Sequence, residues 1–243
     1  MFYVEVFFIT LFLSTFFAMG GVGSAVALVP ILHFLGVNFN LSKAIGLLVN
    51  TSTTLTATIM NIKRKILDIK FALPLAFSLS LFAPLGAYMS KFIPEVYVKG
   101  LFFIFLIFSG SMLLFGKKES KFHYNKPWVL VVLGAIVGII SGLLGIGGGS
   151  ILIPFLILLG FDAKKLAITI SFIIPFSTFA AFLTYLQIVK MDWILLGVAT
   201  VASILGGIIG NHIMYYKLNQ NHIKKIIGIT LYLIALKMLL ALF

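Results

Sequence analysis

The stretch "GLLGIGGGSILIP", residues 142–154, places four glycines within five positions and continues as an apolar run that ends at Pro154. Glycine-rich runs that open helices often bind phosphate through free backbone N–H groups. The P-loop pattern G-x-x-x-x-G-K-[ST] is missing here, because no Lys or Arg occurs in residues 127–163. The dinucleotide pattern G-x-G-x-x-G also fails, since Ser150 stands where its last glycine would be. The run is therefore not a nucleotide-binding loop.

Composition predicts an all-α polytopic membrane protein. The chain of 243 residues is 61% hydrophobic and 10% charged, whereas soluble domains are about 45–50% apolar and about 25% charged. Apolar stretches such as residues 129–160 and 194–214 are long enough to cross a bilayer as helices. The apolar–polar alternation of a membrane β-barrel is absent from the sequence. We expect a multi-pass protein of the cytoplasmic membrane.

The basic charge indicates contact with lipid and not with nucleic acid. The net charge is +12, and the Lys and Arg residues are expected in short connectors, with Lys237 as the exception. Membrane lipid is a partner of such connectors, because anionic headgroups attract them. The chain has no cysteine and no H-E-x-x-H or G-x-S-x-G motif. These observations predict no catalytic residue, no metal site, no cofactor and no enzyme activity.

A second stretch repeats the first. "GVGSAVALVP" (21–30) aligns with "GIGGGSILIP" (145–154) at an offset of 124 residues. The same offset pairs Gly36 with Gly160, Asp68 with Asp192, and Gly86 with Gly210. The sequence thus predicts two membrane repeats of about 115–120 residues, at 1–115 and 127–243, joined by a basic cytoplasmic linker at 116–126.

Each repeat is expected to contain a Gly-broken helix unit followed by three transmembrane helices. The broken units are residues 2–36 and 127–160, and as straight helices each would be ~50 Å long, beyond the ~30 Å hydrocarbon core. The breaks are predicted at residues 20–23 and 145–149, where glycine tolerates unusual backbone angles. The following helices are expected at 43–61, 70–91 and 97–115, and at 165–187, 192–214 and 223–242.

Charge placement favours an inverted arrangement of the two repeats. If each broken unit crosses the membrane once, Lys and Arg divide almost evenly between the two sides. If each unit is a hairpin, most of them gather on one side, as the positive-inside rule expects. That side carries residues 62–70 and 116–126 and is the cytoplasm, with both termini outside. Lys164 and Lys190 then lie on opposite sides. The pattern leaves open whether the units are re-entrant or fully spanning.

The two breaks form the predicted substrate site. Non-helical backbone at membrane depth is tolerated where it lines a cavity, and half-helix N-termini favour an anion there. Polar residues at 50–58 and 171–179 are the next candidates for the lining of the site, with hydrogen bonding between helices as the alternative. The candidate substrate-binding residues are Gly21, Gly23, Ser24, Gly147, Gly148, Gly149, Ser150, Asn50, Thr51, Thr54, Ser171 and Ser177.

Other glycines have a simpler explanation. Gly134, Gly138 and Gly142 are spaced four residues apart, which is typical of close helix packing in membranes. We expect these three glycines to pack against a neighbouring helix rather than to bind a ligand.

The paired motifs "GVGSAVALVP" and "GIGGGSILIP" resemble those of the sulfite/organosulfonate exporter-like permeases, the TauE/SafE family. The resemblance covers both halves of the chain. It implies transport of small sulfur-containing anions such as sulfite and sulfonates. The first copy departs from the pattern, since Ser24 and Ala25 stand where the second copy has Gly148 and Gly149.

These features predict a secondary transporter, or permease, for a small anion, which we expect to be sulfite or an organosulfonate. The alternatives are a non-catalytic membrane subunit of a larger complex and an anion channel. A homodimer is one open arrangement, and the sequence does not decide between import and export.

Overall fold

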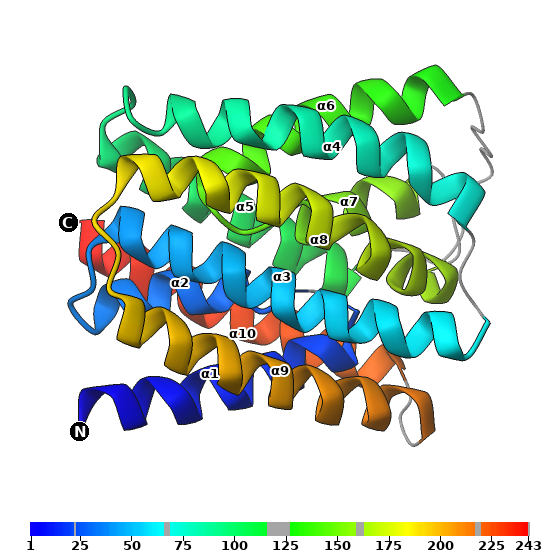
Figure 1. The fold of residues 1–243 in the computed structure, drawn as a ribbon, viewed down its shortest axis with the longest axis horizontal. Helices are drawn as coiled ribbons and strands as arrows, with labels where there is room; N and C mark the ends of the chain where they lie inside the picture. Colours follow the sequence, from blue (N-terminus) through cyan, green and yellow to red (C-terminus); the bar gives the residue numbers. More distant parts are fainter. Residues whose placement is uncertain (22, 66–68, 116–126, 159–162, 217–219, 243) are drawn as a thin grey trace.

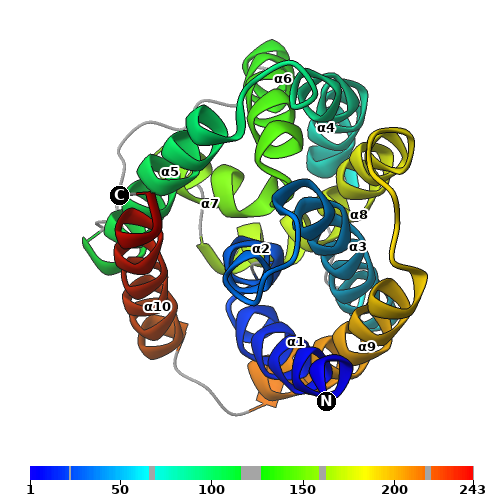
Figure 2. The same ribbon diagram turned by 90° about the vertical axis from the view of Figure 1, so that its left-hand side faces the viewer.

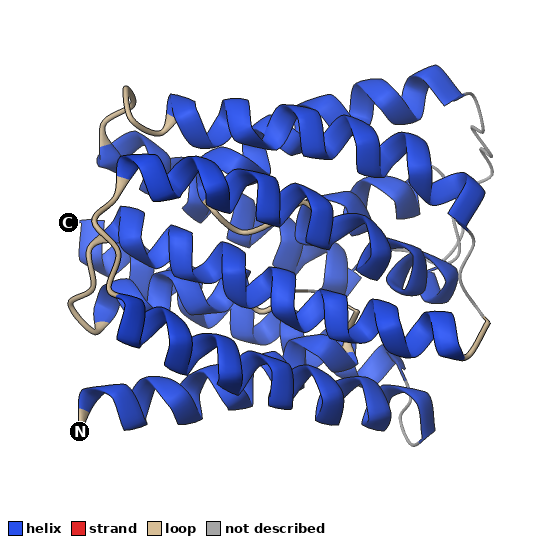
Figure 3. Ribbon diagram, viewed as in Figure 1, coloured by secondary structure: helices blue, strands red, loops and turns tan. Residues whose placement is uncertain are grey.

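The computed structural model describes residues 1–21, 23–65, 69–115, 127–158, 163–216 and 220–242. In this part the chain forms ten helices and no strand (Figures 1 and 3). The helices are α1 (Phe2–Met19), α2 (Ala25–Phe34), α3 (Phe39–Lys63), α4 (Ile69–Met89), α5 (Glu95–Phe115), α6 (Pro127–Leu144), α7 (Gly149–Leu158), α8 (Ala163–Ile188), α9 (Trp193–Tyr216) and α10 (Gln220–Leu242).

Both predicted breaks are present. The first interrupts the chain between α1 and α2, and the second lies between α6 and α7. Gly21, Gly145 and Gly147 in these turns have φ of 69°, 71° and 75°, a region that residues with a Cβ rarely enter. The three helices expected after each break are also present, with bounds within a few residues of the prediction.

Each broken unit folds back on itself (Figure 1). α1 begins and α2 ends at the end of the bundle that carries both termini, whereas α6 begins and α7 ends at the opposite end. α8 runs from that opposite end to the end with the termini. The two hairpins therefore point toward each other from opposite ends of the molecule.

The short helices α2 and α7 lie in the middle of the bundle when it is viewed from the end with the termini (Figure 2). The central position explains why α2 has apolar residues on every side, since residues 25–30 are all buried. A helix that is hydrophobic all round has no face suited to water.

α3 is more polar than its neighbours and is not among the five helices long and apolar enough to be candidate membrane spans. It packs against α2, α8 and α9. Most of its Thr and Asn side chains are consequently buried within the bundle, including Asn50, Thr54 and Asn61.

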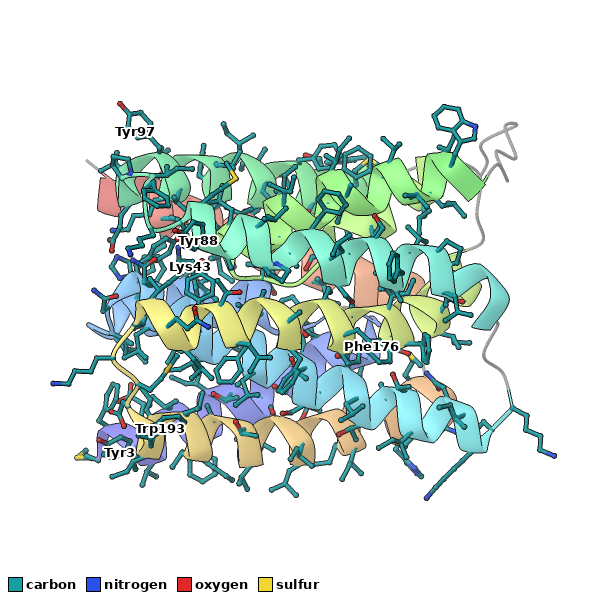
Figure 4. The ribbon with its side chains drawn as sticks, turned by 45° about the horizontal axis from the view of Figure 1, so that its top comes forward. Tyr3, Lys43, Tyr88, Tyr97, Phe176 and Trp193 are labelled. Atoms are coloured by element: carbon teal, nitrogen blue, oxygen red, sulfur yellow. The ribbon has the colours of Figure 1, made fainter. Side chains whose placement is uncertain are left out.

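Exposed apolar side chains cover the outside of the bundle, and exposed aromatic side chains lie at one end of it. α4 exposes apolar side chains such as Phe77, Leu81 and Leu85, as expected of a surface that contacts acyl chains. Exposed aromatic residues gather near the end with the termini (Figure 4), where such residues commonly sit at the headgroup level. They are Tyr3, Tyr88, Tyr97 and Trp193.

Helix α6 packs against α4 through small residues, as predicted. A Cβ at Gly142 would lie 2.0 Å from the Ala83 carbonyl oxygen, and one at Gly138 would lie 3.1 Å from the Leu79 carbonyl oxygen. A Cβ at Gly134 would meet Ser78 at 2.9 Å. On the other side of the bundle, α1 packs along α9.

The prediction that only Lys237 departs from the connectors is wrong. Lys43 lies inside α3 and is buried, and Lys99 lies inside α5. For Lys43 the cause is the start of α3, whereas Lys99 falls within the helix already expected at 97–115. Asn38 accepts hydrogen bonds from the backbone N–H of Asn40 and Leu41, so it caps a helix that begins at Phe39 rather than at residue 43.

Candidate functional site

One face of α3 lies along the second break. Lys43, Gly46 and Asn50 share this face because they are spaced three and four residues apart. A Cβ at Gly145 would lie 2.3 Å from the Cβ of Lys43, and one at Gly46 would lie 3.4 Å from the Gly145 carbonyl oxygen. The chain between α6 and α7 is thus held directly against the helix.

Asn50 contacts both breaks. Its Nδ2 donates a hydrogen bond to the carbonyl oxygen of Ile146, at 3.1 Å. A Cβ at Gly147 would lie 2.2 Å from the same Nδ2, and a Cβ at Gly23 would lie 1.4 Å from Oδ1. The two breaks, 124 residues apart in sequence, therefore meet around one side chain that is 1% exposed.

Asn50 has hydrogen-bonding capacity left over. No partner is found for Oδ1 within the described residues, and the same holds for the buried Oγ of Ser150 in the first turn of α7. Ser24 precedes α2, but its side chain does not cap the helix. Its Oγ lies 3.0 Å from the Oγ of Ser14. The helices α2 and α7 both begin directly after the breaks. The first N–H groups of each helix have no intrahelical acceptor.

A hydroxyl pair lies next to Asn50. Thr51 Oγ1 on α3 and Thr178 Oγ1 on α8 are 2.7 Å apart. A Cβ at Gly147 would also lie 2.5 Å from Cγ2 of Thr178. Among the predicted site residues, the structure therefore brings together Gly23, Gly147, Asn50 and Thr51.

Other predicted site residues point elsewhere. A Cβ at Gly148 would meet Leu79, and one at Gly149 would meet Ile174, so both glycines face apolar side chains. Thr54 and Ser177 donate hydrogen bonds to backbone carbonyls of their own helices. Gly21 supplies a positive φ in the first turn.

Ser171 belongs to a separate polar contact between α3 and α8. Asn61 Nδ2 donates to Ser171 Oγ at 3.1 Å, and Thr58 Oγ1 donates to the Ser171 carbonyl oxygen at 2.6 Å. This contact lies two to three turns along α3 from Asn50. It joins the two helices by hydrogen bonds, the alternative considered for this polar stretch.

The sequence analysis missed Lys43 and its surroundings. Lys43 Nζ donates to Ser90 Oγ, just beyond α4, and to the Leu143 carbonyl oxygen at 3.5 Å. The hydroxyl of Tyr185 donates to the carbonyl oxygens of Gly142 and Leu143, at 3.2 and 3.3 Å. The capping asparagine before α3 was the signal that could have placed Lys43 inside the helix.

The described residues hold no group of three or more His, Asp or Glu side chains that could bind a metal ion. What they hold is a pair of interrupted helices whose turns meet at buried polar groups, inside a helical bundle with an apolar exterior. Interrupted helices that meet inside a bundle are characteristic of membrane transporters.

Comparison with known proteins identifies the family. Residues 6–238 match the family described as "Sulfite exporter TauE/SafE", and the chain belongs to this family. It is a multi-pass membrane protein of a transporter family and not an enzyme.

Individual relatives agree with this assignment. The chain is 29% identical to "Probable membrane transporter protein YunE" of Bacillus subtilis, over 90% of each chain. It is 27% identical to a protein of Methanocaldococcus jannaschii that is also described as a "Probable membrane transporter protein", over 68% of this chain and 66% of that one. A third match, 33% identical over 95 residues, is "Sulfite exporter TauE/SafE family protein 3" of Arabidopsis thaliana.

Proposed function

We propose that this protein is a secondary permease for a small sulfur-containing anion, sulfite or an organosulfonate, held where the two breaks meet. The observation that carries the proposal is the position of Asn50, whose side chain fills the space left by Gly23 of one break and Gly147 of the other. The family described as a sulfite exporter supports the substrate class.

The chemistry of the meeting point suits an oxyanion. The first turns of α2 and α7 offer backbone N–H groups and the positive ends of two helix dipoles. Ser150 supplies a buried hydroxyl without a protein partner among the described residues, and Asn50 Nδ2, which uses one N–H for the Ile146 carbonyl oxygen, has a second N–H to donate. Such groups bind a sulfite or sulfonate oxygen without a neighbouring metal.

We also infer that residues 1–115 and 127–243 are inverted repeats. A Cβ at Gly86 would lie 1.9 Å from the Ile139 carbonyl oxygen, and one at Gly210 would lie 2.2 Å from the Thr15 carbonyl oxygen. Gly86 and Gly210 are 124 positions apart in the sequence, and so are Thr15 and Ile139. In the first contact the glycine belongs to residues 1–115 and the carbonyl to residues 127–243, and in the second contact this is reversed. The pairing of α4 with α6 and of α1 with α9 supports the same exchange. The proposed linker, 116–126, lies outside the described residues.

The inverted arrangement places the basic end of the bundle in the cytoplasm. Lys63, Arg64 and Lys65 lie at the end opposite both termini. Because the chain has no cysteine, single cysteines can be labelled from outside the cell without background. Cysteine at Lys190 should react with a membrane-impermeant maleimide, and cysteine at Lys65 should not. Equal labelling of the two would contradict this orientation.

The function is tested by flux through the purified protein in liposomes. Wild-type protein should release trapped radiolabelled sulfite or a sulfonate, and Asn50→Asp should abolish the release, because the carboxyl group lacks the amide N–H donors and repels the anion when it is ionised. Asn61→Asp is the matched control, since Asn61 is equally buried on the same helix but lies away from the breaks.

The outcomes separate clearly. Flux in wild type and in Asn61→Asp, but not in Asn50→Asp, supports the proposal. Flux at the wild-type rate in both variants would show that the anion does not pass Asn50. Absence of flux from wild type for every sulfur oxyanion tested would contradict the permease assignment.

A further inference from the structure

Lys43 is a buried cation that the proposed site does not use. Its side chain is 1% exposed, and it is an ionisable group inside a membrane bundle, where such residues usually serve a function. In Figure 4 it lies near the end that carries Tyr88 and Tyr97, on the inner side of the exposed aromatic residues.

The groups in direct contact with the ammonium of Lys43 are neutral. Nζ contacts Ser90 Oγ and the Leu143 carbonyl oxygen. It also lies 5.0 Å from the ring centre of Phe39 and 5.2 Å from that of Tyr185. Within the described residues no carboxylate lies at salt-bridge distance from this Nζ.

The nearest acidic candidate already has a partner. Glu95, at the start of α5, pairs with Lys99 one turn along the same helix, at 3.4 Å. The Leu143 carbonyl likewise has a second donor in the Tyr185 hydroxyl, at 3.3 Å. An ammonium at Lys43 is therefore solvated by its neighbours but makes no ion pair among the described residues. A buried ion of this kind is costly unless it is paired.

A purely structural role explains these contacts incompletely. The ammonium lies at the C-terminal end of α6, where a cation interacts favourably with the helix dipole. The carbonyl groups there are already satisfied in part by Tyr185. A neutral side chain of similar length would fill the same space without the cost of burying a charge.

The position of Lys43 connects it with the proposed anion site. It lies on the α3 face that carries Gly46 and Asn50, and the seven residues from Lys43 to Asn50 span about 10 Å along the helix axis. Between them the second break runs along the same face, since Gly145 is packed against Lys43 and Gly147 against Asn50. Lys43 therefore lies on the side of Asn50 that faces the end with the termini, where α3 begins.

We propose that Lys43 is a second anion-binding group, which receives the sulfite or sulfonate on the outer side of the break site. The anion oxygen replaces Ser90 and the Leu143 carbonyl as the partner of Nζ, and it supplies the missing negative charge. This inference rests on the proposed permease function. The residue 124 positions after Lys43 is Ala167, so this binding group belongs to one end of the pathway only.

The test compares Lys43→Met, Lys43→Arg and Lys99→Met in purified protein. Lys99→Met is the matched control, because it removes a nearby cation that already has a carboxylate partner. Two quantities are measured for each protein: the KM for sulfite flux in liposomes, and the rise in melting temperature caused by sulfite relative to an equal concentration of chloride. The second readout reports binding by mass action and is independent of basal stability.

Lys43→Met should raise the KM about tenfold or more, the effect of losing one charge-assisted contact, and should lose most of the sulfite-induced rise. Lys43→Arg should largely retain the wild-type KM and the sulfite-induced rise in melting temperature, and Lys99→Met should match wild type in both quantities. Wild-type KM and a wild-type sulfite response in Lys43→Met would overturn the inference while leaving the permease function intact. A wild-type protein that transports no sulfur oxyanion would overturn both.

Should Lys43→Met not fold, Ser90→Ala gives a second test. It removes a neutral partner of the ammonium and keeps the charge. The anion competes with Ser90 for Nζ, so the sulfite affinity of Ser90→Ala should differ measurably from that of wild type. An unchanged affinity in Ser90→Ala would overturn the inference.

Discussion

Replacement of Gly147 by alanine tests the close approach of the second break to Asn50. Gly147 has φ of 75°, a conformation that costs a residue with a Cβ about 1–2 kcal/mol. The new Cβ would also lie 2.2 Å from Asn50 Nδ2 and 2.5 Å from Thr178 Cγ2. Asn50 cannot withdraw freely, because its Nδ2 is bonded to the Ile146 carbonyl oxygen. Such overpacking costs about 1–3 kcal/mol more.

Gly36→Ala is the matched control for this variant. Gly36 also has a positive φ, 89°, but a Cβ there would meet nothing within 4 Å. The free energy of unfolding of Gly36→Ala should therefore fall only by the backbone cost of about 1–2 kcal/mol. Denaturant unfolding in detergent measures both free energies, and liposome flux measures the consequence for transport.

We expect Gly147→Ala to be less stable than Gly36→Ala by about 1–3 kcal/mol and to lose its sulfite flux, while Gly36→Ala retains it. If the two variants unfold at the same denaturant concentration and transport equally well, Asn50 is not packed against the second break. The geometry of the proposed site would then be wrong.

Two further predictions concern packing between helices. Gly86→Ala and Gly210→Ala should each destabilise the protein by about 1–3 kcal/mol and by similar amounts, because both place a Cβ against a backbone carbonyl on the partner helix. A large effect in one and none in the other, measured by unfolding in detergent, would argue against related halves. Thr51→Val and Thr178→Val, combined in a double-mutant cycle, should show a coupling of about 0.6 kcal/mol, typical of hydrogen bonds between membrane helices, and purely additive losses would mean that the two hydroxyls do not interact.

The helices and the breaks could be predicted from the sequence because their signals are local. Apolar stretches long enough to cross a bilayer predicted most of the spans, and clustered glycines in units too long for one crossing predicted the interruptions. The spacing of Gly134, Gly138 and Gly142 was likewise sufficient to predict packing against another helix, although not which helix.

The site could be predicted only in part, because it depends on contacts between distant segments. Nothing local shows that Gly23 and Gly147 face the same side chain, or that Gly148 and Gly149 face Leu79 and Ile174 instead. The expected helix at 43–61 has Lys43 as its first residue, at the edge of the span. The helix in fact begins earlier, at the cap provided by Asn38, and carries the charge into the bundle.

The most direct test of the central proposal is the position of a bound anion. Selenite is an analogue of sulfite with an anomalous scatterer, so its site can be located in crystals of the protein from the anomalous difference map. The proposal predicts a peak within hydrogen-bonding distance of Asn50 and the first turns of α2 and α7. A protein that transports selenite, but whose anomalous peak lies away from both breaks, would contradict it.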